Sequence, residues 1–293
     1  DGFAFEAYKS AGDYQMIYGL DIENTETERP RMLTEMNLIT RITTNVVDGE
    51  TYPNKTFPDS ETKRKALFFN NRFGLSDSSV LTLGFRYDDY ELSTSPDLLL
   101  SNANILNYQI NNTEDSAFSF KVGYLQDLSE NISGFMQYAE GFKAPDYETS
   151  NTVFTNYLYF YTVTPNPNLE SEESDTFEVG LRGSNKNDSW ELAIYRSEVE
   201  GFILPQIVGF NRGLGIYQYQ NVENVEIQGI EFDYKKSLTE QLSFNLAAAM
   251  SSGDLFEDNA KHPLPAIDPR ELILGLSWIP SDVFSLQALF TIS

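Results

Sequence analysis

The stretch VLTLGFRYD, residues 80–88, decides the fold class of this 293-residue chain. Its apolar side chains recur at every second position: Leu81, Leu83, Phe85 and Tyr87. The positions between them are small or polar: Thr82, Gly84, Arg86 and Asp88. A period of two places one set on each face of an extended chain, so this stretch predicts a β-strand with one apolar face.

The same alternation recurs along most of the chain, whereas helical periodicity is weak. Clear examples are residues 118–124, 176–182, 242–248, 272–278 and 284–292. About twelve or thirteen strands are expected, many of them roughly 9–13 residues long, which exceeds the usual length in globular proteins and fits tilted membrane-spanning strands. No run of about 18 apolar residues predicts a transmembrane helix.

The expected connections between strands alternate between short and long. Short turns are predicted at residues 127–131, 184–188, 237–241 and 280–282, and long loops at residues 30–58, 95–112, 144–170 and 253–268. Outer-membrane barrels have this asymmetry, whereas a soluble β-sandwich has more even connections. Charges on the polar face, such as Arg86, Lys121 and Arg182, suit a lumen filled by water or a plug better than a sandwich core.

Aromatic residues lie near several predicted strand ends, where a girdle at the lipid interface would place them. They are Tyr87, Tyr90, Tyr124, Tyr138 and Trp278. We therefore predict an all-β fold, a transmembrane antiparallel β-barrel in contact with outer-membrane lipid. Residues 1–293 are expected to form a single barrel domain truncated at both ends, because the chain begins at Asp1 and ends within an apolar alternation.

Composition excludes several classes of function. The net charge of −24 disfavours nucleic acid, whose phosphates require clustered lysine and arginine. Without cysteine and with one histidine, most nucleophile–base pairs are unavailable, and no familiar catalytic fingerprint is present, so we expect no enzyme. The acidic run at residues 170–175 is expected to be a solvated face rather than a catalytic carboxylate pair, and no metal site is predicted with confidence.

Five motifs in order carry a family resemblance: FPDSETKR (57–64), LTLGFRYD (81–88), YAEGFKAP (138–145), PNPNL (165–169) and YQNVENVEIQGIEFDY (219–234). This combination resembles the TonB-dependent outer-membrane receptors. GFKAP and NPNL look like the two boxes that flank one extracellular loop in the haem and haemoglobin receptor branch. The box residues are Gly141, Phe142, Lys143, Ala144, Pro145, Asn166, Pro167, Asn168 and Leu169.

The resemblance implies a specific architecture and activity. The family's barrel has about 22 strands, of which this chain would supply about half or more, and a separate N-terminal plug, absent from this sequence, fills its lumen. A TonB-type energy-transducing complex would act through that plug. The expected function is active uptake across the bacterial outer membrane of an iron-containing nutrient, most simply haem or haem from a haemoglobin-like protein. No cofactor would be bound permanently, and haem would be a transported ligand.

This chain departs from the haem branch at one position that matters for the substrate. Receptors of that branch usually ligate the iron with a histidine between the boxes, and this chain has none between Pro145 and Asn166. Its candidates are instead four tyrosines: Tyr147, Tyr157, Tyr159 and Tyr161. A phenolate can ligate ferric haem, but aromatic side chains can also form a rim or stack on a flat ligand or a protein.

The sequence leaves open the role of the boxes, the role of the single histidine and several rival functions. Pro145, which ends the first box, and Pro165, which precedes the second, lack an N–H and cannot sit in a central ladder. The boxes are therefore expected mainly to shape the base of the loop, with direct ligand contact as the lesser alternative. The single histidine, His262, is expected in an exposed loop without a ligand role. Rival functions are a ferric siderophore receptor, a passive porin, and a soluble acidic β-sandwich that binds or cleaves carbohydrate; only the sandwich would stay soluble without detergent.

Overall fold

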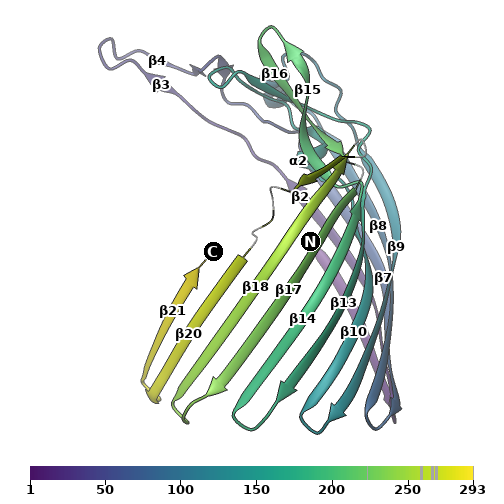
Figure 1. Ribbon diagram of the computed structural model, residues 1–293. Coiled ribbons are helices and arrows are strands. Elements are labelled where there is room, and N and C mark those ends of the chain that lie inside the picture. The colour runs from purple at the N-terminus through teal and green to yellow at the C-terminus, as the bar shows by residue number, and fades with distance from the viewer. Residues whose placement is uncertain (223, 258–259, 265–266, 268–269, 293) are drawn as a thin grey trace.

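The computed structural model describes residues 1–222, 224–257, 260–264, 267 and 270–292. Most of the chain forms long strands that run side by side between two ends of the molecule (Figure 1). They are β1 (Gly2–Ala11), β2 (Tyr14–Thr27), β7 (Asp59–Ser76), β8 (Ser79–Ser95), β9 (Thr113–Ser129), β10 (Ile132–Lys143), β13 (Glu172–Ser184), β14 (Asp188–Glu200), β17 (Asn224–Ser237), β18 (Leu242–Glu257), β20 (Arg270–Ser281) and β21 (Phe284–Ile292).

These strands form one antiparallel sheet in which each strand pairs with the next long strand along the chain. Its order is β1-β2-β7-β8-β9-β10-β13-β14-β17-β18-β20-β21, and a short strand, β19 (Ala260–Pro263), pairs with β18, which gives thirteen strands within the described residues. The sheet curves like part of a barrel wall (Figure 1). The expected fold, a partial antiparallel barrel with twelve or thirteen strands, is confirmed. Among the described residues no helix is long and apolar enough to cross a membrane.

Two adjacent rungs of the sheet show why the sequence alternates. One rung crosses eight strands on the outer face and is apolar throughout: Phe73, Leu81, Tyr124, Met136, Val179, Ile194, Ile230 and Met250. The next rung crosses the same strands on the inner face and is polar or small at all but one position: Arg72, Thr82, Gly123, Gln137, Glu178, Tyr195, Gly229 and Ser251. An exposed apolar outer face next to a polar inner face is the arrangement that lipid outside and water or protein inside require.

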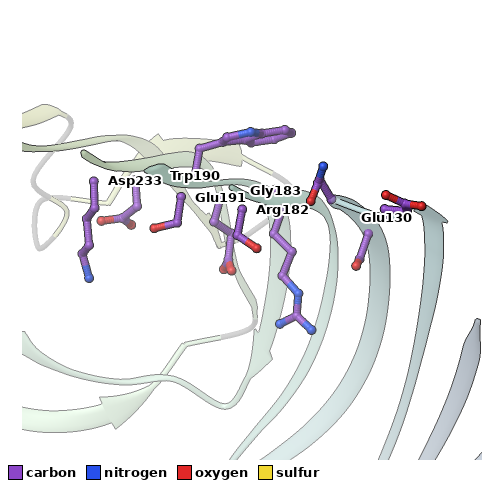
Figure 2. Close-up of a pocket in the computed structure, with 11 residues that line it drawn as sticks. Glu130, Arg182, Gly183, Trp190, Glu191 and Asp233 are labelled. Atoms are coloured by element: carbon purple, nitrogen blue, oxygen red, sulfur yellow. The ribbon is translucent and has the colours of Figure 1, made fainter. Parts of the chain in front are cut away.

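The inner face carries charged side chains at the turn end of the wall too. Figure 2 shows Arg182, Glu191 and Asp233 on the concave side of the sheet, whereas Trp190 projects from the opposite side. These residues border a pocket of about 480 Å³. Arg182 therefore lies on the concave side, as expected for a residue that faces a lumen filled by water or a plug.

Tight turns gather at one end of the wall and long connections at the other (Figure 1). The four predicted short turns are found where expected, between β9 and β10, β13 and β14, β17 and β18, and β20 and β21. Three predicted loops are also found, at residues 28–58, 96–112 and 144–171.

The fourth predicted loop, residues 253–268, is partly wrong. Strand β18 continues to Glu257, and His262 lies in β19 opposite Leu255 rather than in an unpaired loop, although its side chain is exposed as expected. Part of the predicted loop, residues 258–259, 265–266 and 268, lies outside the described residues. A long connection that was not predicted, residues 201–223, separates β14 from β17.

The long connections contain the short elements of the fold. These are β3 (Glu35–Met36), β4 (Thr43–Thr44), β5 (Val46–Val47), β6 (Glu50–Thr51), α1 (Leu98–Ala103), α2 (Tyr147–Asn151), β11 (Phe154–Asn156), β12 (Tyr161–Thr164), β15 (Ile203–Asn211) and β16 (Leu214–Asn221). Many buried side chains lie here rather than in the wall; Phe57, Leu100 and Val153 are at most 2% exposed. The loop end therefore contains its own packed core.

The predicted aromatic girdle is wrong for Tyr90. Tyr90 shares the inner face with Arg86 and Asp88, is buried, and donates its hydroxyl hydrogen to the carbonyl oxygen of Pro145 at 3.1 Å. Tyr87 lies on the outer face, where its ring packs 4.8 Å from that of Phe118. Three positions separate the two tyrosines, so a regular strand places them on opposite faces.

Candidate functional site

Two of the long connections are joined by a small sheet of their own at the loop end. Its order is β11-β12-β16-β15, and β12 runs parallel to β16 with Tyr161 opposite Gly215. β11 and β12 belong to residues 144–171, whereas β15 and β16 belong to residues 201–223. Parallel strands cannot be joined by a tight turn, so this pair links two separate connections. We call the long connections at this end, residues 28–58, 96–112, 144–171 and 201–222, the loop layer.

The first box, residues 141–145, turns the chain from the wall into the loop layer. Lys143 ends β10 and its ammonium donates to the Glu172 carboxylate at 3.2 Å, while Pro145 is fully buried beneath Tyr90. Asp146 then caps α2 by accepting from the backbone N–H groups of Glu148 and Thr149 at 3.0 and 2.8 Å. A capping aspartate satisfies N–H groups that a helix start leaves unpaired, so the local sequence fixes the direction of departure.

The second box, residues 165–169, fastens the returning chain to β16. The Asn166 amide donates to the Tyr219 carbonyl at 2.7 Å, and its oxygen accepts from the Asn168 N–H at 3.0 Å. Gln218 donates to the Pro165 carbonyl at 2.5 Å. Both boxes therefore shape the base of the loop, as their prolines and asparagines suggest. Whether any box residue contacts a ligand remains a prediction.

A buried lysine, missed by the sequence reading, clamps two connections to the wall. The Lys55 ammonium is 2% exposed and contacts the carboxylates of Asp59 at 2.6 Å, Asp97 at 3.0 Å and Glu28 at 3.3 Å. Burial alone would lower the pKa of Lys55, but these three hydrogen-bonded carboxylates outweigh it and raise the pKa above its ordinary value of 10.5. Burial likewise acts to raise the pKa of Asp97, yet the Leu100 N–H and the Lys55 ammonium together lower it below 3.8.

A second missed contact ties residues 96–112 to α2. The fully buried side chain of Asn151 donates to the Asn111 carbonyl and accepts from the Asn111 N–H, both at 2.9 Å. No periodicity in the sequence marks these contacts, because all but the Lys55–Asp59 pair join residues at least 27 positions apart.

Asn151→Asp tests whether this paired contact holds the loop layer together. The substitution keeps the shape but removes the donor and buries a charge against a carbonyl oxygen, so we expect the loop layer to lose about 2–3 kcal/mol of stability. Hydrogen exchange of backbone amides in residues 96–112 and 147–153 would report the loss. Asn107→Asp is the matched control, because Asn107 is exposed and makes no side-chain hydrogen bond among the described contacts. Equal exchange in both variants would contradict the assignment.

The structure separates the four candidate tyrosines. Tyr157 and Tyr159 lie in the turn between β11 and β12, where Tyr159 is 73% exposed, whereas the ring of Tyr161 packs between those of Phe154 and Tyr217 at 5.8 and 5.7 Å. Tyr147 lies elsewhere, with its ring 4.8 Å from that of Phe57. Tyr161 is therefore a packing residue, and the other three tyrosines fall into two places.

An exposed aromatic surface surrounds the β11–β12 turn. The Phe160 carbonyl accepts from the Gly215 N–H at 2.9 Å, and Phe210 lies directly across from Gly215 in the β15–β16 hairpin. The two turns are therefore neighbours, and we call their exposed aromatic side chains the aromatic platform: Tyr157, Tyr159, Phe160 and Phe210. The hairpin sequence, an alternation interrupted by Asn211-Arg212-Gly213, was the signal that could have predicted it.

The aromatic platform is almost uncharged in a strongly acidic chain. No acidic or basic residue occurs from Thr149 to Leu169, and Arg212 is the sole charged residue from Gly201 to Val222. Exposed aromatic side chains on segments with so few charges offer stacking and apolar contact rather than ion pairing.

Tyr147 borders a pocket of about 400 Å³ on the inner face, directly beneath the loop layer. We call it the inner pocket. Its lining includes box residues Phe142, Lys143 and Ala144 and the strand residues Thr25, Thr62, Arg64 and Tyr90. The described residues contain no group of three or more histidine, cysteine or acidic side chains placed to hold a metal ion.

The fold and loop layer define a membrane β-barrel with an elaborated loop end, and sequence comparison identifies its family. The pattern described as "TonB dependent receptor-like, beta-barrel" matches residues 6–291. The chain belongs to this family and is an outer-membrane protein of bacteria.

Individual relatives differ in what their names say they take up. The haemoglobin-haptoglobin utilization protein B of Neisseria meningitidis is 24% identical over 264 residues, which cover 80% of this chain and 32% of that protein. The ferric enterobactin receptor PirA of Pseudomonas aeruginosa is 27% identical over 250 residues, which cover 80% of this chain and 31% of that protein. The chain spans about a third of the length of these relatives.

Solved structures agree on the fold. The copper transporter OprC superimposes with a TM-score of 0.71 at 19% identity and covers 99% of this chain and 43% of its own. The family is thus established, whereas the haem branch is not singled out, because relatives named for haemoglobin, siderophores and copper all match.

Proposed function

We propose that this chain is the loop-bearing wall of an active importer that captures haem, or haem delivered by a haemoglobin-like protein, at the bacterial surface. The observation that carries the proposal is the uncharged aromatic platform at the loop end. A porphyrin is flat and apolar over most of its area, and stacked aromatic rings recognise such a surface without charge. Relatives named for haemoglobin use support the same substrate class.

The platform would bind by stacking rather than by iron ligation. The side chains of Tyr157 and Tyr159 are exposed, so their rings are accessible to a flat ligand. Ferric haem can also accept a tyrosinate as an iron ligand. Stacking requires no ionisation and fits the aromatic run as it stands.

Transport would require parts beyond these residues. A plug domain would fill the concave side of the wall, and a TonB-type complex would supply energy through it. The polar inner rung and the charged pocket in Figure 2 suit a hydrated protein partner in the lumen. Import would make and break no bond, so the proposal assigns no enzymatic activity.

Two sets of substitutions in the full-length receptor would test the platform. Changing Tyr157 and Tyr159 to Phe keeps the rings and removes the hydroxyls, so haem affinity should stay within about twofold. Changing Tyr157, Tyr159 and Phe160 to Ser removes the rings, and at about 1 kcal/mol for each lost contact haem should bind roughly 100-fold more weakly. The measurement is a haem titration in detergent, followed by visible absorption.

Tyr161→Phe is the matched control, because Tyr161 lies in the same loop but packs inside the sheet. If the variant with Tyr157 and Tyr159 changed to Phe loses the haem absorption shift, phenolate ligation and not stacking explains binding. Unchanged affinity in the Ser variant would remove the platform from the binding site.

A ferric siderophore is the second candidate substrate, and the absence of histidine between Pro145 and Asn166 favours it. Many siderophores enclose the iron fully and need no protein ligand. A receptor that gives no absorption shift with haem but binds a ferric catecholate would support this alternative.

A further inference from the structure

Three aromatic side chains on the inner face of the wall each lie opposite a glycine of the neighbouring strand. We call these direct cross-strand partners the glycine–ring pairs: Gly19 with Phe68, Gly180 with Phe135, and Gly229 with Tyr195. They occur in three separate strand pairs, β2–β7, β10–β13 and β14–β17. Among the described strands from β2 to β20, no other aromatic side chain lies on the inner face below the loop layer, because Tyr90 packs beneath that layer.

Each ring occupies the space that a side chain on the opposite residue would need. A Cβ atom at Gly229 would lie 2.6 Å from the hydroxyl oxygen of Tyr195 and 2.7 Å from its Cζ atom. A Cβ atom at Gly19 or Gly180 would likewise collide with the ring of its partner. A glycine within a strand often marks such a close approach, and here it lets the ring lie along the wall.

The exposure of these side chains agrees with rings that lie along the wall. Phe68, Phe135 and Tyr195 are all half-buried. The neighbouring residues on the outer face are more exposed, at 49% for Phe69 and 52% for Ile194. The ring of each pair therefore covers its glycine and projects little into the lumen.

We propose that the glycine–ring pairs keep the inner face free of projecting rings, so that the protein domain in the lumen can seat on this wall and shift along it during import. The proposal rests on the proposed function, which places such a domain on the concave side. Import then requires the absence of a side chain opposite the ring, and not the ring itself. A ring displaced from the wall would hold the domain away from the strands.

Gly229 is the position at which the ring can be displaced without straining the sheet. A Cβ atom there would meet the far end of the Tyr195 side chain, which can move to another rotamer. At Gly180, by contrast, a Cβ atom would also lie 2.6 Å from the backbone carbonyl oxygen of Leu192. A substitution of Gly180 would therefore change the strand pairing as well as the ring.

Gly229→Ala in the full-length receptor should hinder the lumen domain, because the added methyl group pushes the Tyr195 ring off the wall. We expect the ion conductance in planar lipid bilayers to rise about threefold and haem uptake to slow about tenfold. The double variant Gly229→Ala/Tyr195→Ala has no ring to displace, so both quantities should return to within about twofold of wild type. Tyr195→Ala alone should also remain within about twofold.

Gly123→Ala is the matched control. Gly123 also lies on the inner face, but the atom nearest to a Cβ there, from Thr82, would be 3.8 Å away, which is an ordinary contact. The conductance and the uptake of this variant should equal those of wild type. Equal effects of Gly123→Ala and Gly229→Ala would overturn the proposal, because the ring would then have no part in the defect.

A purely structural role of the rings predicts a different pattern. If the rings only shield the glycine backbone, Tyr195→Ala should lower the urea concentration at which half of the receptor is unfolded. The double variant should then be no better than Gly229→Ala. That pattern would overturn the proposal, as would wild-type conductance and uptake in Gly229→Ala.

The conductance does not depend on the substrate, so failure of the haem assignment is recognised separately. If the wild-type receptor conducts little current but takes up no haem, the proposed substrate is wrong, and the conductance of the same variants still decides the role of the glycine–ring pairs. A wild-type receptor that conducts as an open pore has no domain in its lumen. That result would overturn both the proposed mode of import and the role of the pairs.

Discussion

Ile230→Arg should destabilise the barrel by about 2–4 kcal/mol, the cost of placing an arginine on the lipid face near the bilayer midplane. Ile230 lies near the middle of β17, on the apolar outer rung between Ile194 and Met250, and all three side chains are at least 38% exposed. Lipid, not protein, covers this exposed apolar surface in the membrane. The measurement is the free energy of folding of the full-length receptor into lipid vesicles.

The next residue provides the control. Glu231 is exposed on the inner face, so Glu231→Arg changes a charge in the same strand without placing it in lipid. Its effect should stay within about 0.5 kcal/mol. Similar costs for the two substitutions would show that the outer face of this wall does not meet the hydrocarbon.

Lys55→Met should destabilise the loop layer by about 3 kcal/mol, because it leaves three carboxylates close together without a counter-charge. Asp59 and Asp97 are only about a third exposed, so water compensates them incompletely. Hydrogen exchange in residues 28–58 and 96–112 would report the loosening. Lys63→Met is the control: Lys63 is 40% exposed, pairs with Glu61 at 3.3 Å, and should contribute less than about 1 kcal/mol.

The same clamp predicts how the loop layer responds to pH. The folded pKa of Asp97 is depressed, so its stabilisation is present above about pH 4 and is lost as the pH falls through the lower folded value. The folded pKa of Lys55 is raised, so its stabilisation is present below about pH 10 and is lost as the pH rises through the higher folded value. The protection factors of backbone amides in the loop layer should stay constant between these two pH limits. In Lys55→Met they should change with pH within the same range.

Local patterns in the sequence were sufficient to predict the wall. Alternation defines each long strand, and turn residues mark the tight connections, because both effects act between neighbours in the chain. Tyr90 shows that the odd or even spacing between two strand residues must be considered together with their hydrophobicity. Its spacing of three positions from Tyr87 places it on the polar face. The prediction of a place at the lipid interface rested on its aromatic character alone.

The loop layer could not be predicted in the same way. The Lys55 clamp, the Asn151–Asn111 pair and the β12–β16 ladder join residues from 4 to 54 positions apart. Such contacts leave no periodic trace in one sequence. The boxes were correctly expected to shape the loop base, whereas the division of the tyrosines between the platform and the inner pocket depended on tertiary structure.

The parallel pairing of β12 with β16 has a consequence for how this wall can change over evolution. Two connections that emerge from different hairpins share one hydrogen-bonded ladder, so an exchange of either connection alone leaves an unpaired strand edge in the other. Recombination between relatives would preserve folding only when it transfers residues 144–223 as one block, with β13 and β14 included. A transfer that keeps the β12–β16 ladder intact therefore involves about one quarter of the chain rather than a single loop.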